Sequence, residues 1–173
     1  MKNNLYIKIL STLILILFSF AVSAEENKNI NEHQYNFYTG NFDFSDDKQK
    51  AILYGLQHQN ENLERDTFLG TASPITGAFI TENSAAYLYT GVEWNYEMSD
   101  KLKFTPSFAP GVYHEGDGKD LGHALEFRTE VQLSYSISES TNFGMSYNHL
   151  SNASLGIKNP GANSYMFNLL KNF

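Results

Sequence analysis

A histidine, a serine and an asparagine near the end of the chain have the types and spacing of an ester-hydrolysing triad. His149 and Ser151 are two residues apart, and Asn163 follows twelve residues after the serine. On a strand, His149 and Ser151 leave the same face with their Cβ atoms about 7 Å apart, within reach of a hydrogen bond after rotamer choice. We therefore predict His149 as general base, Ser151 as nucleophile and Asn163 as the group that orients the imidazole.

The elements that must position these residues have the period of β-strands. From Gln34 onward, apolar and polar residues alternate with a period of two, and a helical apolar stripe is not found. The predicted strands cover residues 35–42, 52–59, 68–80, 87–98, 104–112, 125–137, 143–147 and 165–173. Pro74 is expected to make the third strand bulged or irregular. Segments with one apolar face, joined alternately by tight and longer connections, predict an all-β fold, an eight-stranded antiparallel outer-membrane β-barrel.

The sixth predicted strand distinguishes a membrane barrel from a soluble, lipocalin-like barrel. Its apolar side chains share one face, and its polar side chains, among them Glu126, Arg128 and Glu130, share the other. A polar face of this kind suits a narrow interior in which carboxylates pair with a guanidinium, and it is a poor lining for a lumen that binds lipid. We therefore expect the apolar face to meet the membrane. Eight strands leave no aqueous pore, so a diffusion channel is not expected.

The first 24 residues have the pattern of a secretory signal peptide. Lys2 and Lys8 give a positive start, residues 9–21 are apolar, and Val22-Ser23-Ala24 offers small residues for cleavage. A retained membrane anchor is the alternative, but an apolar run of about a dozen residues is short for a bilayer that needs roughly 20. We expect residues 25–173 to form the mature barrel domain. The final aromatic strand ends at Phe173 and resembles the C-terminal assembly signal of barrels in the bacterial outer membrane.

The composition excludes several classes of function. The chain of 173 residues contains no cysteine, which rules out a disulfide scaffold, a cysteine zinc site and a cysteine nucleophile. Lysine and arginine total 12 against 19 aspartates and glutamates, and removal of residues 1–24 leaves a formal net charge of −9. This acidic balance argues against nucleic acid as a partner, because phosphate contacts need clustered basic residues.

The position of the triad along its strands predicts the kind of substrate. His149, Ser151 and Asn163 share the parity of the outward aromatic residues Tyr147 and Tyr165. If both chain ends are periplasmic, the seventh strand ascends and His149 lies at the outer leaflet. An imidazole at this depth needs a reason, and an ester in an outer-leaflet lipid would supply one. The alternative is a polar collar above the apolar belt, without chemistry.

At this point the sequence resembles the lipid A 3-O-deacylase family, the PagL type, often called acyloxyacyl hydrolase. The resemblance rests on His-Leu-Ser-Asn-Ala at 149–153, Asn-Pro-Gly at 159–161 and the final aromatic strand. It implies an eight-stranded outer-membrane barrel that removes the ester-linked acyl chain at the 3 position of lipid A. By position, it implies catalytic His149 and Ser151, supporting Asn152 and Ala153, and Asn159 near the oxyanion. The implied partner is lipid A or lipopolysaccharide in the outer leaflet. We expect the protein to be a monomer or a homodimer. The implied chemistry requires no metal or cofactor.

One residue departs from the family pattern. Better-known members have glutamate at the third triad position, where this chain has Asn163. An amide can orient the imidazole through its oxygen, but it cannot stabilise an imidazolium by charge. Three outcomes stay open: weakened hydrolysis, another acid that takes over, or a non-catalytic small barrel with a structural or surface-contact role.

Overall fold

The computed structural model describes residues 33–46 and 49–173. The predicted signal peptide, residues 1–24, lies outside the described residues. Within the described ranges, no helix is long and apolar enough to cross a membrane.

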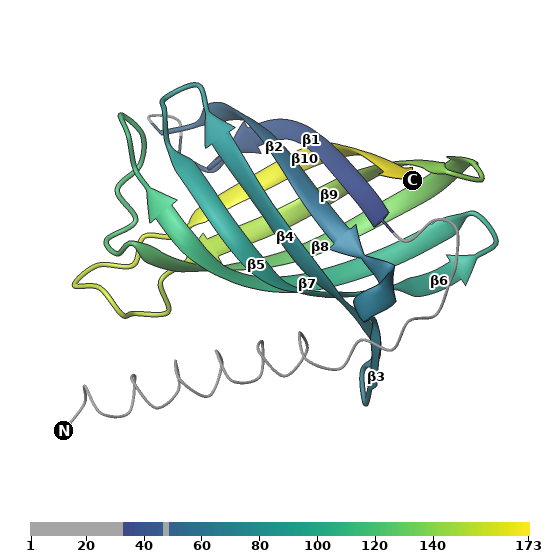
Figure 1. Ribbon diagram of the computed structural model, residues 1–173. Helices are drawn as coiled ribbons and strands as arrows, with labels where there is room; N and C mark the ends of the chain where they lie inside the picture. The colour runs from purple at the N-terminus through teal and green to yellow at the C-terminus, as the bar shows by residue number, and fades with distance from the viewer. Residues whose placement is uncertain (1–32, 47–48) are drawn as a thin grey trace.

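Antiparallel strands close into a barrel, as the alternating pattern predicted (Figure 1). The wall consists of β1 (His33–Phe42), β2 (Ala51–Asn60), β4 (Gly70–Thr81), β5 (Ala86–Trp94), β7 (Leu102–His114), β8 (Leu125–Ser138), β9 (Thr141–Ser151) and β10 (Ala162–Asn172). Each strand pairs with its neighbour along the chain, and β1 pairs with β10 to close the circle. Two shorter strands, β3 (Arg65–Thr67) and β6 (Tyr96–Ser99), and the 3-10 helix η1 (Glu61–Leu63) extend the wall.

Two strands differ in detail from the sequence prediction. β4 is not irregular at Pro74: its register with β5 runs through Pro74 opposite Val92 without a shift. On its other edge, Pro74 lies between the residues that pair with β3 and those that pair with β2, so its missing N–H interrupts neither ladder. The break falls in the predicted fourth strand instead. Asn95 separates β5 from β6, and its Oδ1 accepts a hydrogen bond from Thr105.

The interior is filled with side chains. Arg128 pairs with Glu130, donates to Gln57 Oε1 at 3.2 Å and stacks 4.6 Å from the Tyr89 ring. Tyr89 also belongs to a buried, mostly apolar cluster. This cluster contains Phe42, Leu53, Ile75, Phe79, Tyr87, Tyr113, Leu121, Leu150, Ala162 and Met166. A polar inward face on β8 and a filled interior both agree with the sequence interpretation.

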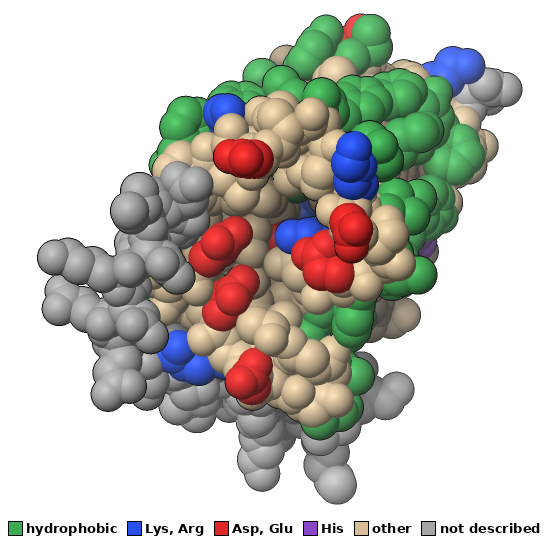
Figure 2. Space-filling model, turned by 90° about the vertical axis from the view of Figure 1, so that its right-hand side faces the viewer, with side chains coloured by type: hydrophobic (Ala, Val, Ile, Leu, Met, Phe, Trp, Pro, Cys, Tyr) green, Lys and Arg blue, Asp and Glu red, His purple; other side chains and the backbone are tan. Residues whose placement is uncertain are grey.

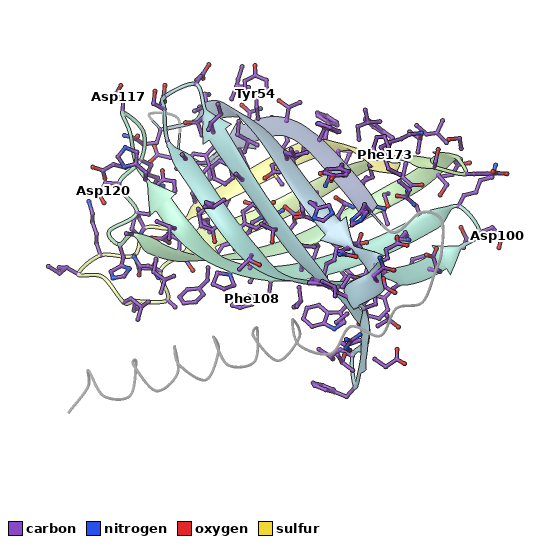
Figure 3. The ribbon with its side chains drawn as sticks, in the orientation of Figure 1. Tyr54, Asp100, Phe108, Asp117, Asp120 and Phe173 are labelled. Carbon is purple, nitrogen blue, oxygen red and sulfur yellow. The ribbon has the colours of Figure 1, made fainter. Side chains whose placement is uncertain are left out.

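The outer surface is apolar and the ends are polar. Tyr54 and Phe108 point away from the wall, whereas Asp117 and Asp120 lie at one end and Asp100 and Phe173 at the other (Figure 3). Seen from the end that carries the C-terminus, charged side chains surround the mouth and hydrophobic side chains cover the flank (Figure 2). We call the opposite end the loop end: residues 43–46 and 49–50, 82–85, 115–124 and 152–161 connect strands there (Figure 1). An apolar belt between polar ends is the surface of a membrane-spanning barrel.

Candidate active site

His149 and Asn163 lie opposite one another on β9 and β10. The register pairs them directly, and His149 Nδ1 lies 2.8 Å from Asn163 Oδ1. Tyr147 donates its hydroxyl to the same oxygen at 2.8 Å. Both residues are half-buried and belong to the outward parity of their strands, near the loop end of the barrel. The structure thus places the predicted orienting residue against the predicted base.

Ser151 shares the outward face of β9 with His149 and is also half-buried. It pairs with Phe127 of β8, as His149 pairs with Thr129. The ring of His149 is hydrogen-bonded to Asn163 and not to Ser151 Oγ. The serine therefore lies on the predicted face and strand, but its hydroxyl is not hydrogen-bonded to the histidine.

Buried residues on the inner side of β9 and β10 alternate with His149, Ser151 and Asn163. Leu150 and Ala162, inward-facing and paired with one another, are 1% and 0% exposed. Gly161 precedes this pair with a φ of +64°, a conformation that glycine adopts without strain. A β-carbon at Gly161 would lie 2.9 Å from His149 Cε1. Because Gly161 has no side chain, the imidazole of His149 can occupy this position without a clash.

The loop after Ser151 contains the other three residues that the sequence singled out. Asn152 is fully buried, and its Nδ2 donates to Leu121 O at 2.7 Å and Lys158 O at 2.9 Å. Its backbone N–H donates to Asn159 Oδ1 at 3.0 Å. Ala153 follows with a φ of +51°. Asn152 therefore fixes the loop from inside, while Asn159, which is exposed, caps it from outside with its Nδ2 still available as a donor.

An ion pair joins this loop to the neighbouring one. Lys158 Nζ lies 2.6 Å from Asp120 Oδ2, and Gly122 N–H donates to Asp120 Oδ1 at 2.7 Å. The hydrogen bond from Lys158, and then that from Gly122, lower the pKa of Asp120 below its ordinary value. Both side chains are exposed, so this ion pair connects the two loops but contributes little to the stability of the barrel. Across the described ranges, no cluster of three or more His, Cys, Asp or Glu could hold a metal ion.

Two further residues reach the site from the loop after β1, and the sequence prediction did not include them. Asn163 Nδ2 donates to Ser45 Oγ at 3.4 Å, and Ser45 Oγ donates to Asp43 Oδ1 at 3.3 Å. Asp43 lies about 120 residues before Asn163, so spacing could not associate them. The closure of the barrel could have indicated that Asp43 and Asn163 are close, because a closed barrel pairs its first and last strands. Asn41 of β1 indeed lies opposite Tyr165 of β10.

Comparison with known proteins relates the sequence to one family and the fold to transmembrane β-barrels. A family model described as lipid A 3-O-deacylase (PagL) matches residues 36–172. The crystal structure of the outer membrane enzyme PagL is similar with a TM-score of 0.62 and 17% identity, over 80% of this chain and 98% of that one. Neisserial surface protein A (NspA) gives a TM-score of 0.55 at 9% identity, over 86% of this chain and 100% of the other. No curated protein sequence matches the chain.

The fold and these comparisons define the class as an outer-membrane β-barrel, in agreement with the predicted location. Because the family model covers most of the chain, the chain belongs to the lipid A 3-O-deacylase (PagL) family. The resemblance that the motifs at 149–153 and 159–161 indicated is thereby confirmed.

Proposed function

We propose that this protein hydrolyses the ester-linked acyl chain at the 3 position of lipid A, with Ser151 as nucleophile and His149 as general base. Family membership supports the reaction class. The observation that carries the assignment of residues is the 2.8 Å contact between His149 Nδ1 and Asn163 Oδ1, on the face that also bears Ser151. A histidine oriented by an acceptor and placed beside a serine is the arrangement that activates a hydroxyl nucleophile.

The hydrogen bond to Asn163 determines which nitrogen of the His149 ring can act as the base. A carbonyl oxygen only accepts, so His149 Nδ1 carries the proton and Nε2 keeps its lone pair. Nε2 then takes the proton of Ser151 as Oγ attacks the ester carbonyl carbon. The tetrahedral intermediate collapses to an acyl-serine, and His149 returns the proton to the departing sugar oxygen. A water molecule, deprotonated by the same Nε2, hydrolyses the acyl-serine and releases the fatty acid.

The loop after Ser151 supplies donors for the oxyanion. Asn159 is held by its Oδ1, which accepts from Asn152 N–H at 3.0 Å, so its Nδ2 points its two hydrogens elsewhere. We assign this amide and the backbone N–H of Ala153 to the negative oxygen of the intermediate. Each such donor typically contributes about 3 kcal/mol to the transition state. Asn152 and Ala153 thereby act as support, through a buried side chain and a left-handed backbone.

An apolar groove on the outer wall gives the acyl chain a place to lie. It has a volume of about 310 Å³ and crosses β7 to β10 on the membrane face. Its outward lining includes Val131, Leu133, Met145, Tyr147 and Tyr165. Tyr147 connects the groove to the triad, because its hydroxyl donates to Asn163. A lipid whose chain follows this groove brings its ester to the loop end, where Ser151 lies.

The missing contact between Ser151 and His149 is compatible with this mechanism. Catalytic hydrogen bonds are often long in the free enzyme and tighten when substrate binds. The two residues leave the same face of β9, so Ser151 Oγ can approach the ring without a change of strand register.

Mass spectrometry of lipid A from cells that produce the protein tests the proposal. We expect loss of one hydroxyacyl chain with the wild type and intact lipid A with Ser151→Ala. Ser146→Ala, an interior change on the same strand as Ser151, provides a control that leaves the outer face unaltered. Identical, fully acylated lipid A from wild type and Ser151→Ala would support the alternative, a non-catalytic barrel.

A further inference from the structure

The side-chain amide of Asn163 can face His149 in two ways, and only one of them makes a base. With Oδ1 toward the ring, Nδ1 carries the proton and Nε2 is free, as found. With Nδ2 toward the ring, Nδ1 would have to accept and Nε2 would carry the proton. In serine proteases, an asparagine in place of the triad aspartate lowers kcat by about 10⁴-fold because the imidazole takes that wrong tautomer. A chain with asparagine at this position therefore needs something that fixes the amide.

The immediate neighbours of the amide do not fix it. His149 can donate or accept at Nδ1 according to its tautomer, and the Tyr147 hydroxyl, 2.8 Å from Oδ1, can also do either. The Ser45 hydroxyl, 3.4 Å from Nδ2, has the same freedom. Each of these three groups would tolerate the reversed amide.

Asp43 removes this freedom, because an ionised carboxylate only accepts. Its charge is paired with Lys119, whose Nζ lies 2.5 Å from Oδ2, and its residue is 1% exposed. Oδ1 accepts from Ser45 Oγ at 3.3 Å and lies 3.4 Å from the backbone N of Asn163. Since Ser45 must donate to Asp43, its oxygen is left to accept from Asn163, and the atom that faces Ser45 must be Nδ2. Oδ1 then faces His149.

We propose that Asp43 is a positioning residue that sets the direction of the hydrogen-bond chain Asp43–Ser45–Asn163–His149 and thereby the tautomer of the base. The carboxylate does not touch the imidazole; it acts through two intervening side chains. This inference assigns the acid that the sequence lacks at position 163 to the loop after β1, and its catalytic consequence rests on the proposed function.

The surrounding backbone keeps the chain in register. Phe44 N–H donates to Asn163 O at 3.0 Å, which ties the loop after β1 to the first residues of β10. Asp43 has a φ of +49°, a left-handed conformation that aspartate tolerates better than most residues. Lys119 brings the loop after β7 to the same point. The ion pair is therefore built into the junction of two loops and a strand, beside the site.

The tautomer of His149 tests the inference without reference to turnover. In detergent-solubilised protein with ¹⁵N-labelled histidine, the His149 signals are identified by their loss in His149→Gln. We expect protonated Nδ1 and unprotonated Nε2 in the wild type. In Ser45→Ala, which leaves the Asp43–Lys119 pair intact, and in Asp43→Asn, we expect a population with protonated Nε2. Asp100→Asn, the same loss of charge at the opposite end, serves as control (Figure 3).

Kinetics and a rescue variant separate a positioning role from a merely structural one. Ser45→Ala and Asp43→Asn are expected to lower kcat by about ten- to a hundred-fold with KM nearly unchanged, within the ~10⁴-fold limit of a wholly wrong tautomer. Asn163→Asp in the Asp43→Asn background should restore the protonated Nδ1, because a carboxylate at 163 accepts only. An unchanged tautomer in Ser45→Ala overturns the inference, whether or not the wild type deacylates lipid A. Wild type without deacylase activity but with the predicted tautomer shifts contradicts the proposed function and leaves this inference standing.

Discussion

Gly161 lies against the edge of the His149 imidazole, so close that a β-carbon at 161 would be 2.9 Å from His149 Cε1. The glycine is also in a left-handed conformation, φ +64°, at the entry to β10. Because Asn163 follows two residues later, this glycine fixes both the space and the path that bring the ring and its acceptor together.

Gly161→Ala should therefore lower kcat by roughly ten-fold or more, since a displaced ring loses its alignment with the serine. The backbone strain alone is about 1 kcal/mol. Gly70→Ala is the matched control: it also has a positive φ, +106°, but its β-carbon would meet nothing closer than 3.6 Å. Equal losses of lipid A deacylation in the two variants would show that strain, and not the contact with His149, is responsible.

The anchoring of the loop by Asn159 and its proposed role as an oxyanion donor can be separated by substitution. Asn159→Asp keeps an oxygen for the N–H of Asn152 but removes the Nδ2 donor. We expect kcat to fall about 10²- to 10³-fold, the usual cost of one oxyanion donor, with KM nearly unchanged. Steady-state release of fatty acid by the purified protein measures this. Wild-type rates in Asn159→Asp, together with a loss in Asn159→Ala, would restrict the residue to anchoring the loop.

A carboxylate at position 163 should raise the rate. Asn163→Asp keeps the length of the side chain that places Oδ1 2.8 Å from His149 Nδ1, whereas Asn163→Glu adds one methylene. The added charge stabilises the imidazolium that forms as Ser151 loses its proton, and we expect kcat to rise at least about ten-fold. Measured kcat for the Asp, Glu and Ala variants gives the comparison. A rate for Asn163→Asp no higher than that of Asn163→Ala would show that His149 is not the base.

Breaking the interior ion pair between Arg128 and Glu130 should destabilise the wall behind the site. Arg128 and Glu130 are nearly fully buried, so Arg128→Met leaves an unpaired carboxylate and should lower the free energy of unfolding by about 3 kcal/mol or more. Adding Glu130→Gln to Arg128→Met should recover part of this. Urea unfolding in lipid vesicles measures the change. Lys103→Met, which breaks an exposed pair with Glu97, should cost under about 1 kcal/mol, and an equal cost would contradict the argument from burial.

Strong alternation made the fold predictable, whereas the details of the site depended on closure. The polar face of β8 with Glu126, Arg128 and Glu130 specified a narrow interior and an apolar exterior, and the structure agrees. Pro74 was misjudged because its effect depends on which strand lies beside its missing N–H, and the sequence does not show that. Asp43 escaped prediction for a related reason: its partner is brought to it by the pairing of the first and last strands.

The placement of His149 opposite Asn163 was predictable because β9 and β10 are adjacent antiparallel strands. Such a pairing is a local relationship, and its register follows from the sequence pattern. The rotamer of Ser151 has no such signal. A side chain that is half-buried at the edge of a loop takes its orientation from its surroundings, and the spacing of residues does not specify these.

Detection of an acyl-enzyme tests whether Ser151 is the nucleophile. Purified protein is mixed with lipid A, quenched in acid within the first turnover and digested, and the peptide that contains Ser151 is examined by mass spectrometry. We expect this peptide to carry the added mass of one hydroxyacyl chain, and no such adduct to form in Ser151→Ala or His149→Gln. Release of fatty acid at an undiminished rate by Ser151→Ala, or an adduct on any other residue, would contradict this expectation.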